Sequence, residues 1–376
     1  MMLEQPDGVE VAATREEAER LASPPLLIVD TMLDFLNRSG LGQGPLSWSR
    51  IGDGNSNITY RLERGGQVFV LRRGPRPPLA KSTHDMMREA KIQRLVGAAG
   101  VAVPEILAAS DDLSILGVPF YLMKFVDGII ITDEVPAESD SLDRRRETSF
   151  AAVHELARLH SVDVTSGELA TLGRPEGYLR RQVERFSSLW PLYSQRELPQ
   201  VDSLAAWLLD HLPTSQAASM VHGDYRLGNL MFAADAPTRV QAILDWEMAT
   251  LGDPLADLGY LTATYAEKGS EPNPLELTSV TRQAGFLTRD ELVEAYAQAS
   301  THSLNLDALP WYQGLALWKA AIFCEDIYTR WLKGERDEDS EFAPTLEHGV
   351  PALLRAAEGF ARLHRNSAAA VAVRVG

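Results

Sequence analysis

Cysteine is almost absent from the sequence, and so are long apolar runs and any excess of positive charge. The single cysteine, Cys324, excludes a disulfide bond within the chain, which is typical of a reducing cytoplasm. No apolar run approaches the roughly 18 residues that cross a membrane, and the N-terminus lacks the basic start and apolar segment of a signal peptide. We therefore expect a cytoplasmic protein without a membrane partner.

The charge balance argues against nucleic acid as a partner. The sequence has 36 Lys and Arg residues against 52 Asp and Glu residues, and its net charge of −16 repels phosphate backbones and anionic membranes. The acidic residues are spread along the chain, so they indicate solubility more than a cationic ligand. The 376 residues suffice for one large domain or two ordinary ones, and the oligomeric state stays open between monomer and homodimer.

Apolar periodicity predicts an α+β chain with a β-rich part before a helical part. Residues 46–126 should form a small N-terminal lobe with about five antiparallel strands and one helix. Residues 127–364 read as a larger, mainly helical C-terminal lobe. An N-terminal extension with one helix, residues 1–45, precedes these lobes, and a flexible tail, residues 365–376, follows them.

The segment from His222 to Asn229 contains the residues that indicate a catalytic site. It reads His-Gly-Asp-Tyr-Arg-Leu-Gly-Asn, which suits a loop, and Asn229 follows Asp224 by five residues. Asp245 comes directly after a predicted β-hairpin at 230–244. Phosphoryl transfer needs a carboxylate for the acceptor hydroxyl and oxygen ligands for Mg²⁺, and this set supplies both. The spacing of Asp224 and Asn229 equals that in the catalytic loop of protein kinases.

Together with Leu244–Glu247 and Leu251–Leu258, this segment resembles the aminoglycoside phosphotransferase/choline kinase family, whose members share the protein-kinase-like bilobal fold. The resemblance covers about residues 46–335. The stretch at 172–182 is similar to one branch, which includes the kinase-like region associated with acyl-CoA dehydrogenases.

The resemblance implies that ATP, with GTP left open, donates its γ-phosphate to a hydroxyl group of a small molecule. Asp224 would be the catalytic base, and Asn229 and Asp245 would complete the catalytic set as ligands of Mg²⁺. His222 would hold the loop through side-chain hydrogen bonds. Asp257 would be a buried carboxylate that accepts backbone N–H bonds from the loop, because a buried charge needs such partners.

A nucleotide site is expected in the N-terminal lobe. Gly52, Gly54 and Asn57 lie between two predicted strands, where a loop would cover the phosphates, although a plain hairpin turn explains them equally well. Arg72 stands on the third strand where the family usually has Lys, with Glu89 as its expected partner; this departure puts activity in question, but not the fold. The last strand and the hinge supply the candidates for contact with the base, namely Met123, Lys124 and Val126.

Two other functions stay open. A catalytically silent nucleotide-binding regulator would fit Arg72 and the irregular glycine loop, but the complete Asp224, Asn229 and Asp245 set argues against it. A metal-dependent hydrolase would use His222 with the two aspartates, and His154 or His160 would then approach them in space.

The acceptor has two candidate classes. The acidic composition permits a polycationic aminoglycoside, whereas the dehydrogenase-associated branch indicates a hydroxyacyl-CoA-type metabolite. An anionic acceptor of the second class calls for basic residues near the site, and Arg174, Arg180 and Arg181 are the candidates, although an exposed helix face explains them as well.

Overall fold

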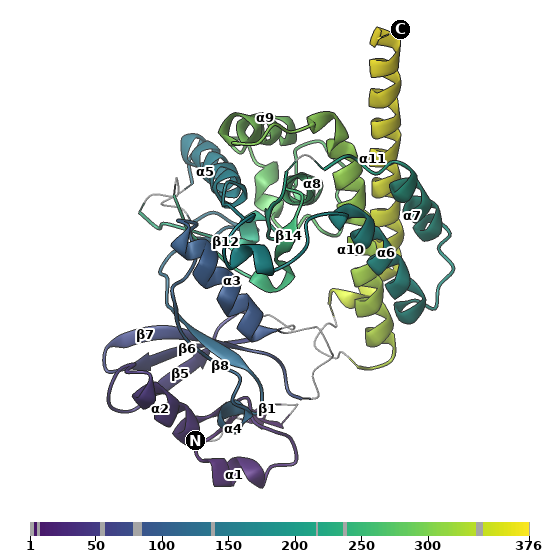
Figure 1. The fold of residues 1–376 in the computed structure, drawn as a ribbon. Helices are drawn as coiled ribbons and strands as arrows, with labels where there is room; N and C mark the ends of the chain where they lie inside the picture. Colours follow the sequence, from purple (N-terminus) through teal and green to yellow (C-terminus); the bar gives the residue numbers. More distant parts are fainter. Residues whose placement is uncertain are drawn as a thin grey trace. The chain divides into compact units, whose positions relative to one another are not determined.

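The computed structural model describes residues 4–5, 8–52, 57–77, 85–136, 140–215, 217–235, 239–335 and 341–375. The chain forms two compact units, Met1–Asp127 and Gly128–Gly376. Figure 1 shows the β-rich first unit and the mainly helical second unit. Among the described residues, no helix is both long and apolar enough to cross a membrane.

The first unit is built on a five-stranded antiparallel sheet in the order β5-β6-β7-β9-β8. The strands are β5 (Ser47–Arg50), β6 (Ile58–Arg64), β7 (Gln67–Arg73), β8 (Ile106–Ser110) and β9 (Phe120–Lys124). Helix α3 (Met86–Ala98) packs against β8 and β9. Gly65 and Gly66 have positive φ angles of 56° and 77° in the β6–β7 turn, a conformation that glycine adopts at little cost. The predicted antiparallel sheet with one helix against it is confirmed.

Short elements before and beside the sheet complete the core of the first unit. They are β1 (Glu4–Gln5), β2 (Gly8–Val9), β3 (Val11–Ala12), α1 (Arg15–Glu19), β4 (Leu27–Ile28), α2 (Val29–Arg38) and α4 (Leu113–Leu116). The helix α2 in the N-terminal extension begins at Val29 and not earlier, because the backbone amides of Leu26 and Leu27 donate to the carbonyl of Glu10 and β4 pairs with β3.

The second unit consists of long helices around two small sheets. The helices are α5 (Leu142–His160), α6 (Tyr178–Tyr193), α7 (Gln200–Asp210), α8 (Leu255–Thr264), α9 (Arg289–Ala299), α10 (Leu309–Leu332) and α11 (Leu346–Val375). The strands β10 (Ile129–Ile130), β12 (Leu230–Phe232) and β13 (Val240–Ile243) form one sheet, and β11 (Ser219–Val221) pairs with β14 (Thr250–Gly252) in the other. The helix α11 continues through residues 365–375, where the sequence predicts a flexible tail.

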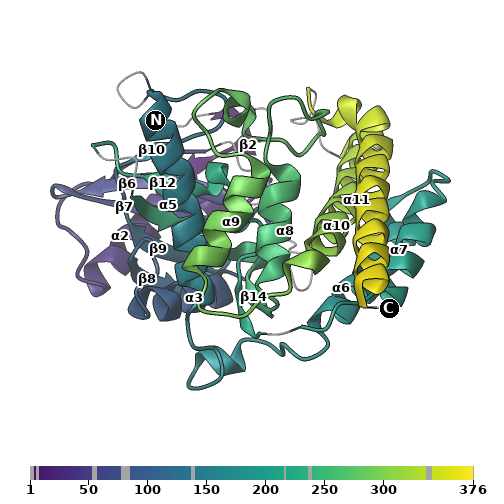
Figure 2. The same ribbon diagram turned by 90° about the horizontal axis from the view of Figure 1, so that it is seen from above.

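Helix α10 is the centre of the second unit. Figure 2 shows α9, α8, α10 and α11 in succession, and α10 contacts both α8 and α11. The indole N–H groups of Trp311 and Trp318 are buried and donate to the carbonyls of Leu208 and Val201 on α7, at 3.1 and 3.0 Å. A Cβ atom on Gly259 would lie 2.6 Å from Cβ of Tyr312, so glycine permits the close approach of α8 to α10.

Candidate active site

The loop from His222 to Asn229 connects β11 to β12. It ends in a 3₁₀ turn, Leu227–Asn229, that leads directly into β12. Gly223 has a φ of +89°, and a Cβ atom there would lie 2.8 Å from Cβ of Met248. Both the backbone conformation and the lack of space therefore require glycine at this position.

Asp257 of α8 fixes the start of this loop. Its two carboxylate oxygens accept the backbone N–H groups of His222 and Gly223, each at 2.7 Å, and the side chain is completely buried. Nε2 of His160 lies 3.2 Å from the same carboxylate. Burial alone raises the pKa of Asp257, but the hydrogen bond and charge of His160, with the Gly223 amide, hold it below its usual value. The predicted backbone contacts of Asp257 are confirmed.

The His222 side chain supports the loop from within. Nε2 donates to the carbonyl of Leu244 at 2.9 Å, and Nδ1 accepts the backbone N–H of Asp224 at 3.3 Å. This arrangement requires the neutral imidazole with its proton on Nε2. The predicted structural hydrogen bonds are confirmed, and both ring nitrogens are engaged with the backbone rather than turned toward a metal. His222 therefore does not serve the hydrolase hypothesis.

Asp224 is held by polar groups on several sides. Nδ2 of Asn229 donates to its carboxylate Oδ2 at 2.7 Å and to its backbone carbonyl at 2.8 Å. Nε of Arg226 lies 3.6 Å from Oδ1, and the hydroxyl of Tyr260 on α8 hydrogen-bonds to the carboxylate. Burial and the charge of Asp224 raise the pKa of Tyr260 well above its usual range, so the phenol stays a donor. The side chain of Asp224 is still 24% exposed, which leaves it accessible to a ligand.

Asp245 lies at the far end of the β12–β13 hairpin, beside Asn229. Leu230 pairs with Ile243 in the hairpin, and the backbone N–H of Leu244 donates to the carbonyl of Asn229 at 2.8 Å. The φ of Asp245 is +66°, and among the described residues it is the only non-glycine in the left-handed region. Such strain is found at functional sites, where the surrounding structure maintains it.

The donor set at this hairpin end fits Mg²⁺. With its Nδ2 turned to Asp224, Asn229 offers its amide oxygen as the remaining polar atom, and Asp245 adds a carboxylate. Mg²⁺ is typically held by few protein oxygens together with water and phosphate. In the part of the chain that the structure describes, no three His, Cys, Asp or Glu side chains gather as a metal site, which a hydrolytic transition metal would need.

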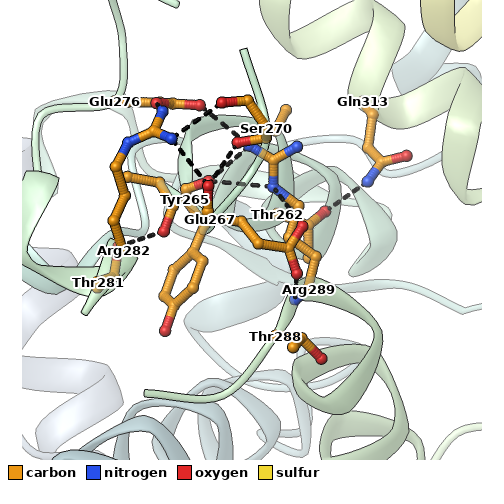
Figure 3. Close-up of polar contacts among 12 residues, drawn as sticks. Thr262, Tyr265, Glu267, Ser270, Glu276, Thr281, Arg282, Thr288, Arg289 and Gln313 are labelled. Atoms are coloured by element: carbon orange, nitrogen blue, oxygen red, sulfur yellow. Dashed lines mark hydrogen bonds and ion pairs between the residues drawn. The ribbon is translucent and has the colours of Figure 1, made fainter. Parts of the chain in front are cut away.

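A polar network holds the segment that follows α8 (Figure 3). Arg282 and Arg289 both pair with Glu276, the second with Nη2 3.1 Å from Oε1. The same guanidinium groups donate to backbone carbonyls of Tyr265, Glu267 and Ser270. Burial raises the pKa of Glu276, and the two arginines oppose this rise. These ion pairs and carbonyl contacts order the segment that follows α8.

The first unit contains the predicted pair Arg72 and Glu89. Nε of Arg72 on β7 lies 3.0 Å from Oε1 of Glu89 on α3, and the Glu89 side chain is 2% exposed. The Tyr121 hydroxyl donates to Oε1 of Glu89 at 2.8 Å and accepts from Gln93 at 3.0 Å. The contact that the sequence predicts is thus present, while its role toward phosphate stays a prediction.

The other predicted nucleotide residues lie on the same unit. Gly52 has a φ of +77°, Asn57 is buried at the start of β6, and Gly54 lies outside the described residues. Met123 is half-buried and Lys124 is exposed at the end of β9, with half-buried Val126 just beyond. Their contact with a base stays a prediction.

The structure also changes the list of candidate acceptor residues. The Arg181 guanidinium donates to the backbone carbonyls of Glu176 and Arg174, so it is already engaged with the loop before α6. Arg180 lies on the exposed face of α6, 3.9 Å from Glu184. Two contributors were not predicted in these roles: Tyr260, which holds Asp224, and His160, which holds Asp257. Neither had a local sequence signal, because both contacts join residues far apart in the chain.

Comparison with known proteins identifies the family to which this chain is similar. The family model described as the phosphotransferase enzyme family matches residues 47–315. Acyl-CoA dehydrogenase family member 11 of Gallus gallus is 35% identical over 317 residues, which cover 82% of this chain and 40% of that protein. The chain therefore spans less than half the length of this relative.

Two solved structures show the same architecture. A candidate aminoglycoside phosphotransferase from Ralstonia eutropha is 28% identical, with a TM-score of 0.75 over 89% of this chain and 98% of that one. A spectinomycin phosphotransferase, solved in complex with ADP and spectinomycin, is 11% identical, with a TM-score of 0.58 over 88% of this chain and 98% of that one. The similarity to the spectinomycin phosphotransferase shows a shared fold and nothing more.

Proposed function

Because this chain belongs to the phosphotransferase enzyme family, we propose that it transfers the γ-phosphate of ATP to a hydroxyl group of a small molecule. The observation that carries the proposal is the loop at 222–229, which is fixed by Asp257 and holds Asp224 against Asn229. The chain has a single cysteine, which favours the reducing cytoplasm as its compartment.

Asp224 is the general base in this proposal. Its Oδ2 is oriented by Asn229, and its partial exposure allows an acceptor hydroxyl to reach the carboxylate. Phosphoryl transfer depends mainly on positioning and charge stabilisation, so a rigid loop contributes directly to the rate.

Asn229 and Asp245 would hold Mg²⁺. The ion would supply positive charge against the phosphate oxygens. In the first unit, Arg72 would bind phosphate while Glu89 keeps its guanidinium in place. Gly52, Gly54 and Asn57 would cover the phosphates, and the base would meet the end of the sheet at Met123, Lys124 and Val126. The ADP complex of the spectinomycin phosphotransferase supports a nucleotide as donor, and GTP stays open beside ATP.

The experiment is an acceptor screen with the purified chain, Mg²⁺ and either ATP or GTP. Aminoglycosides, amino alcohols and hydroxyacyl-CoA compounds are incubated, and phosphorylated products are detected by mass spectrometry. We expect a product that gains one phosphoryl group in step with ADP formation. Nucleotide binding without any phosphorylated product would instead support a silent nucleotide-binding regulator, and the proposal would be abandoned.

A further inference from the structure

Four polar side chains of the first unit meet between the sheet and α3. Arg72 on β7 and Tyr121 on β9 are direct partners in the antiparallel register, so their Cβ atoms lie on one face of the sheet, about 4.5–5.5 Å apart. Glu89 and Gln93 are four residues apart on α3, which packs against β9, and therefore share one face of the helix. Sheet and helix thus contribute one pair each to the same cluster.

The hydroxyl group of Tyr121 has one proton, and the hydrogen bonds of this cluster fix its direction. Nε2 of Gln93 donates to the hydroxyl oxygen at 3.0 Å. The hydroxyl proton therefore goes to Oε1 of Glu89, 2.8 Å away. Burial, and then the charge of Glu89, raise the pKa of Tyr121 well above its usual range, so the phenol keeps this proton. Tyr121 is thus a fixed donor to the Glu89 carboxylate.

The carboxylate oxygen that Tyr121 holds is also the one beside Arg72. Nε of Arg72 lies 3.0 Å from Oε1 of Glu89. The Glu89 side chain is 2% exposed, so its orientation depends on protein groups and not on bulk water. The Arg72 side chain is 15% exposed and ends in a planar group. When Nε faces Glu89, the two terminal nitrogens of this group form the fork that matches a pair of phosphate oxygens.

We propose that Tyr121 and Gln93 are positioning residues, which act through Glu89 to hold the Arg72 guanidinium in the orientation that binds the phosphates of the nucleotide. This inference rests on the proposed function, in which Arg72 binds phosphate. It also accounts for an arginine at a position where the family usually has lysine. A lysine ammonium is a point charge with rotatable donors, whereas the planar guanidinium binds phosphate well only in a defined orientation.

The test begins with Tyr121→Phe, which removes the hydroxyl group and keeps the ring that packs with Met86 and Ala90. Calorimetric titration of ADP in the presence of Mg²⁺ measures binding without turnover. Because hydrogen bonds to a carboxylate are stronger than neutral ones, we expect Tyr121→Phe to bind ADP about tenfold more weakly than the wild type. Gln93→Met keeps the length of the side chain but lacks the amide that directs the hydroxyl proton, and should weaken ADP binding about threefold.

Tyr60→Phe is the matched control in the same unit. Tyr60 on β6 is buried as well, and its hydroxyl hydrogen-bonds to the carboxylate of Glu10. It pairs with Leu71 of β7, so its side chain lies on the opposite face of the sheet from Arg72. Thermal unfolding should show a similar loss of stability in Tyr60→Phe and Tyr121→Phe, while Tyr60→Phe keeps its ADP affinity within about twofold. Equal losses of ADP affinity in the two variants would reveal a general effect of stability and overturn the inference.

A double-mutant cycle with Arg72→Lys tests whether Tyr121 acts on the orientation of the guanidinium. In the Arg72→Lys background, Tyr121→Phe should weaken ADP binding by at most about threefold, compared with about tenfold in the wild type. The difference is expected because an ammonium group has no plane to orient. An equal loss in both backgrounds would mean that Tyr121 supports the unit in general, and the positioning role would be withdrawn.

The same measurements separate this inference from the proposed function. If Tyr121→Phe weakens ADP binding as expected but the acceptor screen yields no phosphorylated product, the positioning role stands and the phosphotransferase proposal fails. If products form but Tyr121→Phe and Gln93→Met bind ADP as tightly as the wild type, the positioning role fails and the phosphotransferase proposal stands.

Discussion

Replacing Asp257 with asparagine should destabilise the second unit and impair the catalytic loop together. The two backbone amides of His222 and Gly223 donate to its oxygens at 2.7 Å, and His160 contacts the same carboxylate. Asparagine keeps one acceptor oxygen but turns an NH₂ group toward the other partners. One amide then loses its acceptor, and the hydrogen bonds that remain lose their charge. We expect a loss of about 3–5 kcal/mol in the free energy of unfolding.

Urea unfolding followed by fluorescence measures this change, with Asp202→Asn on the exposed face of α7 as the matched control. At a temperature where the variant stays folded, turnover should fall about a hundredfold, because the loop that carries Asp224 is no longer fixed. A loss below about 1 kcal/mol, with normal turnover, would refute the role given to Asp257.

The pH dependence of the same variant tests the electrostatic part of the explanation. The folded pKa of Asp257 is lower than its usual value of about 3.9, so its charged form stabilises the fold above that pH. This contribution is lost as pH falls through the folded pKa. The stability difference between wild type and Asp257→Asn should therefore shrink in acid, and a difference that grows there would have the wrong sign.

Three further predictions concern other parts of the molecule. Arg72→Met should lower the free energy of unfolding, measured by thermal denaturation, by about 3 kcal/mol, because Glu89 then loses the Arg72 cation. The same variant should bind nucleotide more weakly in a titration, and an unchanged nucleotide affinity would remove Arg72 from the site. Asp245→Asn should keep stability within about 0.5 kcal/mol, since asparagine tolerates the left-handed backbone, yet raise the Mg²⁺ concentration needed for turnover. Lys319 on α10 lies over the Phe186 ring of α6, and burial lowers its pKa to about 8. Lys319→Met should therefore stabilise the protein by about 1–2 kcal/mol at pH 7. This gain should fade between pH 8 and the usual lysine pKa, because wild-type Lys319 then loses its unfavourable charge, and chemical unfolding across that range would show it.

The sequence predicted those features that depend on local pattern. Alternating apolar residues located the five-stranded antiparallel sheet of the first unit. The motif around Asp224 led to the hydrogen bonds of His222 and Asp257, because the resemblance supplied the long-range partner that periodicity cannot provide.

Other features depend on contacts that no local pattern encodes. The strands β10, β11 and β14 have only two or three residues, too few to show alternation, and they are defined by their pairing partners. The contact of His160 with Asp257 joins residues 97 positions apart. The left-handed backbone of Asp245 is imposed by the hairpin and the turn that follow from the fold, since aspartate alone seldom adopts it.

The most direct test of the central claim is the rate of phosphoryl transfer by Asp224→Asn. Asparagine can preserve the contact with Asn229 through its side-chain oxygen but cannot accept a proton from the acceptor hydroxyl. With the acceptor found by the screen, we predict that kcat falls by about 10²–10⁴ while nucleotide affinity, measured by titration, stays unchanged. Turnover by Asp224→Asn at the wild-type rate would contradict the assignment of this loop as the catalytic centre.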